Sequence, residues 1–192
     1  MVEKAAKEFL AQGQERSVEV IIVNDSPWER VELPENESHS FRLIVIDNKK
    51  NSGIHQSRVN GLEKAAGEYV LFLDQDDEIS GDCLCTQIKA ARGADLVLGN
   101  GIFELPDHQK AAIYGNHFSL KFASRAKPNV MIRDFIVSPG QCLIKKNSIP
   151  MEWRRCVMKK NGADDYLLWL LMFNNKMSVS VNDAFVYTHK YT

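Results

Sequence analysis

The residues that decide the fold are Tyr69-Val-Leu-Phe-Leu-Asp-Gln-Asp-Asp77, a hydrophobic run that ends in three carboxylates. Such a run is typical of a buried strand, and in open α/β sheets ligands bind beyond the carboxyl ends of the strands. Neighbouring carboxylates repel one another unless they are solvated or share a cation, and oxygen ligands suit Mg²⁺ or Mn²⁺. The stretch therefore predicts a site for a metal and a diphosphate. The alternative is an acidic loop that starts a helix.

Strands and helices alternate along the chain on both sides of this stretch. Apolar residues at helical spacing indicate helices over 2–10, from 51 to 67, over 81–92, at about 150–160 and over 164–174. Hydrophobic runs predict strands at 18–24, 41–46, 69–73, 95–98 and 141–144, and a strand pair near 177–188. The alternation predicts an α/β fold, with a mostly parallel sheet flanked by helices. No linker divides the chain, so residues 1–192 are expected to form a single domain.

Composition excludes several classes of protein. The 192 residues carry 24 Lys and Arg against 25 Asp and Glu, and the net charge of −1 argues against a nucleic-acid binder, which needs a basic face. No polybasic run is present to hold an anionic membrane, and the longest apolar run, 166–173, is far shorter than the ~20 residues of a membrane helix. The four cysteines lack zinc-finger spacing and indicate free thiols in a reducing cytoplasm.

Two further features of the sequence offer groups that could take part in chemistry. Asp164 and Asp165 open a strongly apolar helix, so one of them can cap the helix while the other projects into a cleft as a general base. Capping alone is the simpler interpretation of an acid in this position. Near the C-terminus, His189 offers an imidazole that can bind a metal, although a hydrogen-bonded structural role is more common for a single histidine.

Together these segments resemble a family 2 glycosyltransferase of the GT-A fold. The resemblance is carried, in order along the chain, by residues 20–26, 51–53, 57–58, 61–62, 67–77 and 162–169. It covers most of the chain, and it depends on the order and spacing of the whole set because no single motif is decisive. The resemblance implies an enzyme that transfers a sugar from a nucleotide donor, expected to be a UDP-sugar, to the hydroxyl group of an acceptor.

The resemblance also assigns roles on the donor side of the site. Asp25 matches the acid that contacts the uracil of a UDP-sugar. Arg58 matches the arginine of the family's A-R-N-x-G stretch, which implies a contact with the nucleotide, although Val59 replaces the asparagine there. Asp74 and Asp76 match the D-x-D pair, with the first near the ribose and the metal's water shell and the second on the Mn²⁺ or Mg²⁺ ion.

On the reacting side, Asp165 matches the second acid of the family's "ED" motif, which is the catalytic base, and Asp164 replaces the usual glutamate. His189 lies where related enzymes often place a histidine near the metal and the diphosphate. The implied reaction is a single displacement with inversion, in which Asp165 takes the proton of the attacking hydroxyl and the metal neutralises the leaving diphosphate.

The resemblance suggests surface polysaccharide or glycan assembly, with a saccharide or lipid-linked acceptor that contacts residues 99–140 and the C-terminal segment. It implies a cytoplasmic protein that works in solution or at the inner face of the membrane. A homo-oligomer is compatible with the sequence.

One departure from the family concerns the start of the chain. Family members usually begin with a strand of the type V-S-V-I-I-P-x-Y-N, in the middle of the sheet, whereas this chain begins with the helix that follows it. We therefore expect an N-terminally truncated member in which the first central strand is missing and its neighbours lack hydrogen-bond partners. The alternative function is accordingly an inactive GT-A-like fragment or interaction module.

Two other enzyme classes share parts of this pattern. A haloacid-dehalogenase-type phosphatase also places D-x-D after a strand, but after its first strand, whereas two predicted strands precede the motif here. That family's threonine or valine, four residues after the first aspartate, is Glu78 in this chain. A GT-A nucleotidyltransferase would need a glycine-rich basic loop after the first strand, and none is present in the sequence.

Overall fold

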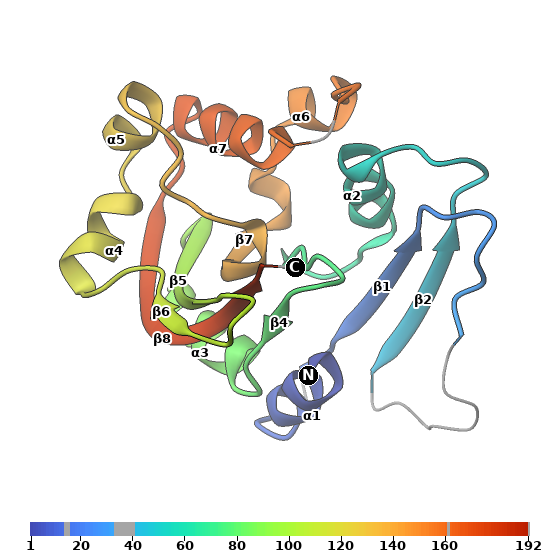
Figure 1. The fold of residues 1–192 in the computed structure, drawn as a ribbon, viewed down its shortest axis with the longest axis horizontal. Coiled ribbons are helices and arrows are strands. Elements are labelled where there is room, and N and C mark those ends of the chain that lie inside the picture. The colour runs from blue at the N-terminus through green and yellow to red at the C-terminus, as the bar shows by residue number, and fades with distance from the viewer. Residues whose placement is uncertain (14–15, 33–40, 161, 192) are drawn as a thin grey trace.

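The computed structural model describes residues 1–13, 16–32, 41–160 and 162–191, which form an α/β structure (Figure 1). The helices are α1 Val2–Leu10, α2 Ile54–Lys64, α3 Cys83–Ala91, α4 His117–Ala123, α5 Ala126–Met131, α6 Met151–Arg155 and α7 Asp164–Asn174. The strands are β1 Glu19–Asn24, β2 Arg42–Asp47, β3 Tyr69–Val70, β4 Glu78–Ile79, β5 Leu96–Glu104, β6 Lys110–Ala112, β7 Cys142–Lys145 and β8 Val179–Lys190. The four cysteines are free, as expected. No helix in these ranges is long and apolar enough to cross a bilayer.

The strands of the described chain form two sheets. β1 and β2 pair in parallel, from Glu19 opposite Arg42 to Asn24 opposite Asp47. The larger sheet has the order β3-β7-β5-β8-β4, and β6 pairs with β5. Within it β5 and β8 run parallel, whereas the other pairs are antiparallel. The α/β class with flanking helices is as predicted, but the sheet is mixed rather than mostly parallel. The reason is that β7, from the second half of the chain, inserts antiparallel between β3 and β5.

The predicted strand at 69–73 is shorter in the structure, where β3 ends at Val70. β3 has β7 as its strand neighbour in the described part of the chain, and the pairing covers Tyr69 and Val70. Leu71, Phe72 and Leu73 follow β3, half-buried, and no described residue pairs with them as a strand. β1 likewise pairs on one edge, with β2, so the two sheets are not joined by a strand among the described residues.

Two other predicted elements have different bounds in the structure. The predicted strand pair near 177–188 is wrong, because residues 179–190 form the single strand β8, whose irregularity is absorbed by register shifts opposite Asn100. The predicted helix at about 150–160 ends at Arg155. Beyond it the N–H of Met158 donates to His55 Nδ1 at 3.0 Å, a hydrogen bond to another helix that a continued α6 would lose.

The main core lies where α7 and α6 pack against the larger sheet. From α7, Leu168, Trp169 and Met172 are fully buried, and Trp153 of α6 is buried beside them. Fully burying large apolar side chains contributes roughly 1.5–3 kcal/mol each, so the apolar run of α7 anchors this helix firmly. The start of α7, with its two acids, is thereby held in a fixed position.

Candidate functional site

Arg58 joins the two acidic motifs of the sequence in one site. From α2, its Nη2 donates to Asp74 at 2.7 Å (Oδ1) and 3.0 Å (Oδ2), and its Nη1 donates to Asp164 Oδ2 at 2.8 Å. The side chains of Arg58 and Asp164 are 11% and 4% exposed. Burial by itself lowers the pKa of Arg58, but the charges of Asp74 and Asp164 outweigh that effect and raise it. Arg58 thus contacts acids of both motifs, and its contact with the nucleotide remains a prediction.

The two acids at the start of α7 have different surroundings. Asp164 is buried, and its backbone carbonyl accepts a hydrogen bond from Trp153 Nε1 at 2.7 Å. Asp165 is half-buried, and its carboxylate accepts from the N–H of Tyr166 at 2.8 Å. Burial raises the pKa of Asp165, against the opposing effects of that hydrogen bond and of Arg58. The N-cap residue is Ala163, with no side-chain hydrogen bond, so neither acid occupies the N-cap position, although Asp165 does accept from an N–H of the first turn. A half-buried carboxylate with a raised pKa can accept a proton.

Asp134 is a further acid of this site that the sequence analysis missed. Burial raises its pKa to about 6, the N–H of Ile136 opposes this, and the charge of Asp165 adds to it. The residue lies between α5 and β7, in a segment without periodicity. Its position next to the candidate base depends on the packing of α5 against α7, which no local pattern indicates.

Asp77 and Tyr187, which are buried, and His189, which is half-buried, form a cluster where β4 pairs with the end of β8. The hydroxyl of Tyr187 donates to Asp77 Oδ2, and the N–H of Lys190 donates to Asp77 Oδ1 at 3.2 Å. His189 Nδ1 lies 3.1 Å from Asp77 Oδ1. A carboxylate accepts hydrogen bonds, so this contact assigns the proton to Nδ1 and leaves Nε2 as the nitrogen that can bind a metal. Metal-binding histidines commonly donate their other ring nitrogen to a carboxylate in this way.

Asp76, the residue predicted to bind the metal, is exposed and has no hydrogen-bond or ion-pair partner in the described ranges. Within those ranges no three His, Cys, Asp or Glu side chains converge on one point that could hold a metal ion. Asp74 is engaged by Arg58, and His189 by Asp77. The donor set therefore fits a cation that takes one or two protein ligands and completes its shell with substrate phosphates.

Asp25, at the carboxyl end of β1, is held by the loop that leads into α2. Its Oδ1 accepts from the N–H of Ser52 at 2.7 Å and from Asn48 Nδ2 at 2.8 Å, and its Oδ2 accepts from the N–H of Gly53 at 2.8 Å. Gly53 has a φ of 84°, which favours glycine. Burial tends to raise the pKa of Asp25, but these hydrogen bonds outweigh it and lower the pKa. The carboxylate stays ionised, with acceptor capacity left for the N–H of a nucleobase.

His55 is a second residue that the sequence analysis missed. Its Nε2 lies 3.0 Å from the carbonyl of Trp153, its Nδ1 accepts from Met158, and its ring packs 4.5 Å from the Trp153 ring. Burial lowers the pKa of His55, so the ring is neutral near pH 7. Because Trp153 in turn bonds the backbone of Asp164, His55 connects α2 to the start of α7. A lone histidine early in a helix carries no signal for such a contact.

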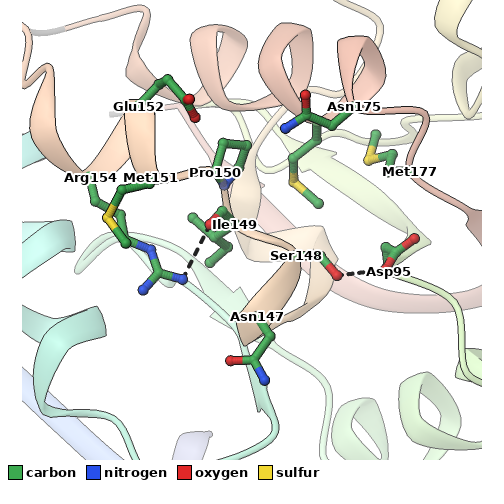
Figure 2. Close-up of a pocket in the computed structure, with 11 residues that line it drawn as sticks. Asp95, Asn147, Ser148, Ile149, Pro150, Met151, Glu152, Arg154, Asn175 and Met177 are labelled. Atoms are coloured by element: carbon green, nitrogen blue, oxygen red, sulfur yellow. Dashed lines mark hydrogen bonds between the residues drawn. The ribbon is translucent and has the colours of Figure 1, made fainter.

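A hollow of about 570 Å³ lies away from these residues (Figure 2). Two hydrogen bonds lie within it, since Ser148 Oγ donates to Asp95 at 2.5 Å and Arg154 Nη2 donates to the carbonyl of Ile149 at 3.2 Å. None of the predicted site residues lines it. The hollow therefore does not coincide with the candidate site, which is defined by the convergence of its charged groups.

Comparisons with known proteins identify the family and the fold. Residues 1–149 match the family model described as Glycosyl transferase family 2. An uncharacterized glycosyltransferase of Haemophilus influenzae is 42% identical over 73 residues, which are 38% of this chain and 24% of that protein. The GalNAc(5)-diNAcBac-PP-undecaprenol beta-1,3-glucosyltransferase of Campylobacter jejuni is 32% identical over 110 residues, 54% of this chain and 35% of that protein.

A crystal structure of S. aureus TarS 1-349 in complex with UDP-GlcNAc has a similar fold. The TM-score is 0.64 at 16% sequence identity, over 99% of this chain and 55% of that chain. The similarity confirms the GT-A-like fold. This chain spans about half the TarS chain and a quarter to a third of the two relatives.

Proposed function

This chain belongs to glycosyl transferase family 2, and from that premise we propose that it transfers a sugar from a UDP-linked donor to an acceptor hydroxyl with inversion. The single observation that carries the proposal is the pair of hydrogen-bonded contacts from Arg58 to Asp74 and Asp164. They bring a donor-side acid and the start of the base-bearing helix into one site. Residues more than a hundred positions apart in the sequence thus form one charged centre.

Asp165 is the general base of the proposed reaction. Its half-buried carboxylate has a raised pKa, which favours accepting a proton from the acceptor hydroxyl as that oxygen attacks the anomeric carbon. Asp164 keeps Arg58 in place and is a positioning residue. His55 and Trp153 hold the backbone of Asp164, so they fix the direction from which Asp165 meets the acceptor.

On the donor side, Asp25 accepts a hydrogen bond from the nucleobase, and Asp76 with His189 Nε2 would hold Mn²⁺ or Mg²⁺. The metal supplies charge neutralisation of the leaving diphosphate when bound. Asp77 and Tyr187 orient His189. The UDP donor is supported by the UDP-GlcNAc complex of TarS, and the name of the C. jejuni relative supports a lipid-linked saccharide as acceptor.

A second candidate function is nucleotide binding without transfer. It is favoured by the arrangement of the strands in two separate sheets. Asp25 follows β1 in the smaller sheet, whereas Asp76 lies beyond β3 in the larger one. Transfer requires the two parts to hold one donor rigidly, whereas binding of the nucleoside alone requires the first part only.

The test combines thermal shift with UDP release from a panel of UDP- and GDP-sugars, with and without Mn²⁺. We expect UDP to raise the melting temperature only with the metal, and Asp76→Ala to abolish that increase. Asp165→Asn should keep the increase and slow UDP release by about 10²–10⁴-fold. The matched control is Asp107→Ala, an exposed acid outside the site, which should change neither.

Two outcomes would contradict the transferase. Stabilisation by metal without nucleotide dependence, together with phosphate release, would indicate a phosphatase. A nucleotide-dependent shift without UDP release from any donor would support the second candidate.

A further inference from the structure

Three consecutive apolar side chains at the end of α5 are exposed to solvent. Val130, Met131 and Ile132 have 54%, 71% and 68% of their surface accessible. The backbone beneath them is fixed by the buried Asn129, whose Nδ2 donates to the carbonyls of Ala123 and Arg125 at 2.7 Å. α5 lies at the edge of the molecule, on the side away from β1 and β2 (Figure 1). The backbone that bears these exposed apolar side chains is therefore held in place by hydrogen bonds.

The longer segment that contains these apolar residues, 108–133, is strongly cationic. From residue 108 to 133 the sequence has five Lys or Arg residues and no Asp or Glu, although the whole chain carries a net charge of −1. Four of these basic side chains, Lys121, Arg125, Lys127 and Arg133, are exposed. None of the four pairs with a carboxylate within the described residues. They are dispersed along the sequence rather than contiguous, so they form no polybasic run.

A hollow of about 460 Å³ opens beside the start of α5. Lys121, Ser124, Arg125 and Lys176 line it with cationic and hydroxyl groups, and Phe173 and Met177 contribute apolar surface. No acidic side chain of the described chain is among its lining residues. Three cations and a hydroxyl around one hollow form a suitable environment for a phosphate group.

We propose that the surface formed by the basic residues Lys121, Arg125, Lys127 and Arg133 and the apolar residues 130–132, here called the α4–α5 surface, docks on an anionic phospholipid membrane. Phosphate headgroups would occupy the cationic hollow, while Val130, Met131 and Ile132 enter the boundary between headgroups and acyl chains. Interfacial binding of this kind combines buried apolar area with attraction of Lys and Arg to anionic lipids. A symmetric contact between two copies is disfavoured because it would bring two cationic surfaces together.

The surface also lies next to the candidate base. Tyr166 of α7 donates through its hydroxyl to the carbonyl of Asn129 at 2.7 Å. Asp134, whose charge environment includes Asp165, directly follows Arg133. Docking by α5 would thus bring the reacting side of the site to the bilayer, where a lipid-linked acceptor is held. Membrane docking itself does not depend on transfer, so it can be tested separately from the proposed function.

The test is co-sedimentation of the full chain with vesicles of phosphatidylcholine alone or with about one third phosphatidylglycerol. We expect partition into the anionic vesicles only, decreasing as salt is raised. Each basic residue near such a surface contributes a factor of about five, so Lys121→Gln with Arg125→Gln should lower the partition more than tenfold. Met131→Ser with Ile132→Ser should lower it by about tenfold and make the remainder more sensitive to salt.

Matched double variants on other exposed residues serve as controls. Lys159→Gln with Lys160→Gln, and Leu105→Ser with Met151→Ser, should leave the partition within twofold of the wild type. Equal binding to neutral and anionic vesicles, or no effect of the α4–α5 variants, would overturn the proposal. So would self-association in solution that Met131→Ser with Ile132→Ser abolishes, because the occupant would then be a second copy of the chain.

Discussion

The pKa values of the carboxylates in two regions of the molecule are shifted in opposite directions. One region is the loop that holds Asp25, and the other is the junction of α5 and α7, which holds Asp134 and Asp165. Asp25 accepts hydrogen bonds from two backbone N–H groups and an amide, and its pKa is lowered. Asp134 and Asp165 each accept from a nearby N–H, and burial raises the pKa of both. Two differences act in the same direction, because Asp25 has three donors and is less deeply buried, whereas Asp134 and Asp165 have one donor each and burial dominates. In the proposed reaction this separation of pKa values distinguishes the roles of the acids, because Asp25 stays ionised while Asp134 and Asp165 are suited to receive protons.

The largest expected effect is the loss of the cation that faces both motifs. Arg58→Met would leave Asp164 buried and uncompensated, and breaking a buried ion pair costs about 3–5 kcal/mol. We expect a corresponding decrease in the free energy of unfolding, measured by urea titration at pH 7. The matched control is Arg155→Met, an exposed arginine in α6, which should change the value by less than about 0.5 kcal/mol. A similarly small change in the free energy of unfolding for Arg58→Met would mean that water compensates the charge of Asp164.

The second prediction concerns the donors around Asp25. Asp25→Asn turns one acceptor into an NH₂ group facing the N–H of Gly53, so two donors would meet and the charge-assisted bonds would be lost. We expect a loss of about 2 kcal/mol in unfolding free energy and weaker nucleotide binding. Asp47→Asn is the matched control at the end of β2, where one exposed hydrogen bond to Asn24 is affected. Equal effects of the two substitutions would show that the loop does not depend on the Asp25 charge.

The sequence could predict the features of the fold and the site that depend on a local pattern of residues. Asp25 and Asp165 adjoin strongly apolar runs, so their places at a strand end and in the first turn of a helix were predictable, whereas the strand expected to end at Asp74 ends at Val70. Asp134 and His55 were missed because their environment is made by packing between distant segments. The same reason explains the mixed sheet, since the antiparallel insertion of β7 depends on contacts between residues 69–70 and 144–145 rather than on a local pattern.

The third prediction uses pH to separate the two regions. The pKa of Asp134 is raised to about 6, so the folded chain binds this proton more tightly than the unfolded chain, and stability falls as pH rises from about 4 to 6. Asp134→Asn should remove that decrease and, allowing for partial solvation, stabilise the protein at pH 7 by about 1–2 kcal/mol. Asp25 has the opposite sign, because its lowered pKa gives stability that is lost only as pH falls below about 4. Urea titrations between pH 3 and 7.5 (on the order of ten points) measure both.

The smallest expected change in stability comes from the candidate base itself. Its raised pKa means that the charged form of Asp165 is disfavoured in the folded state, so Asp165→Asn should raise the unfolding free energy at pH 7 by about 0.5–1 kcal/mol. Asn also keeps an oxygen to accept from the N–H of Tyr166. A gain in stability together with loss of UDP release is the signature of a residue whose charge is kept for reaction rather than for folding. A loss of stability of similar size would instead place Asp165 with Asp25, as a carboxylate that the fold requires in its ionised form.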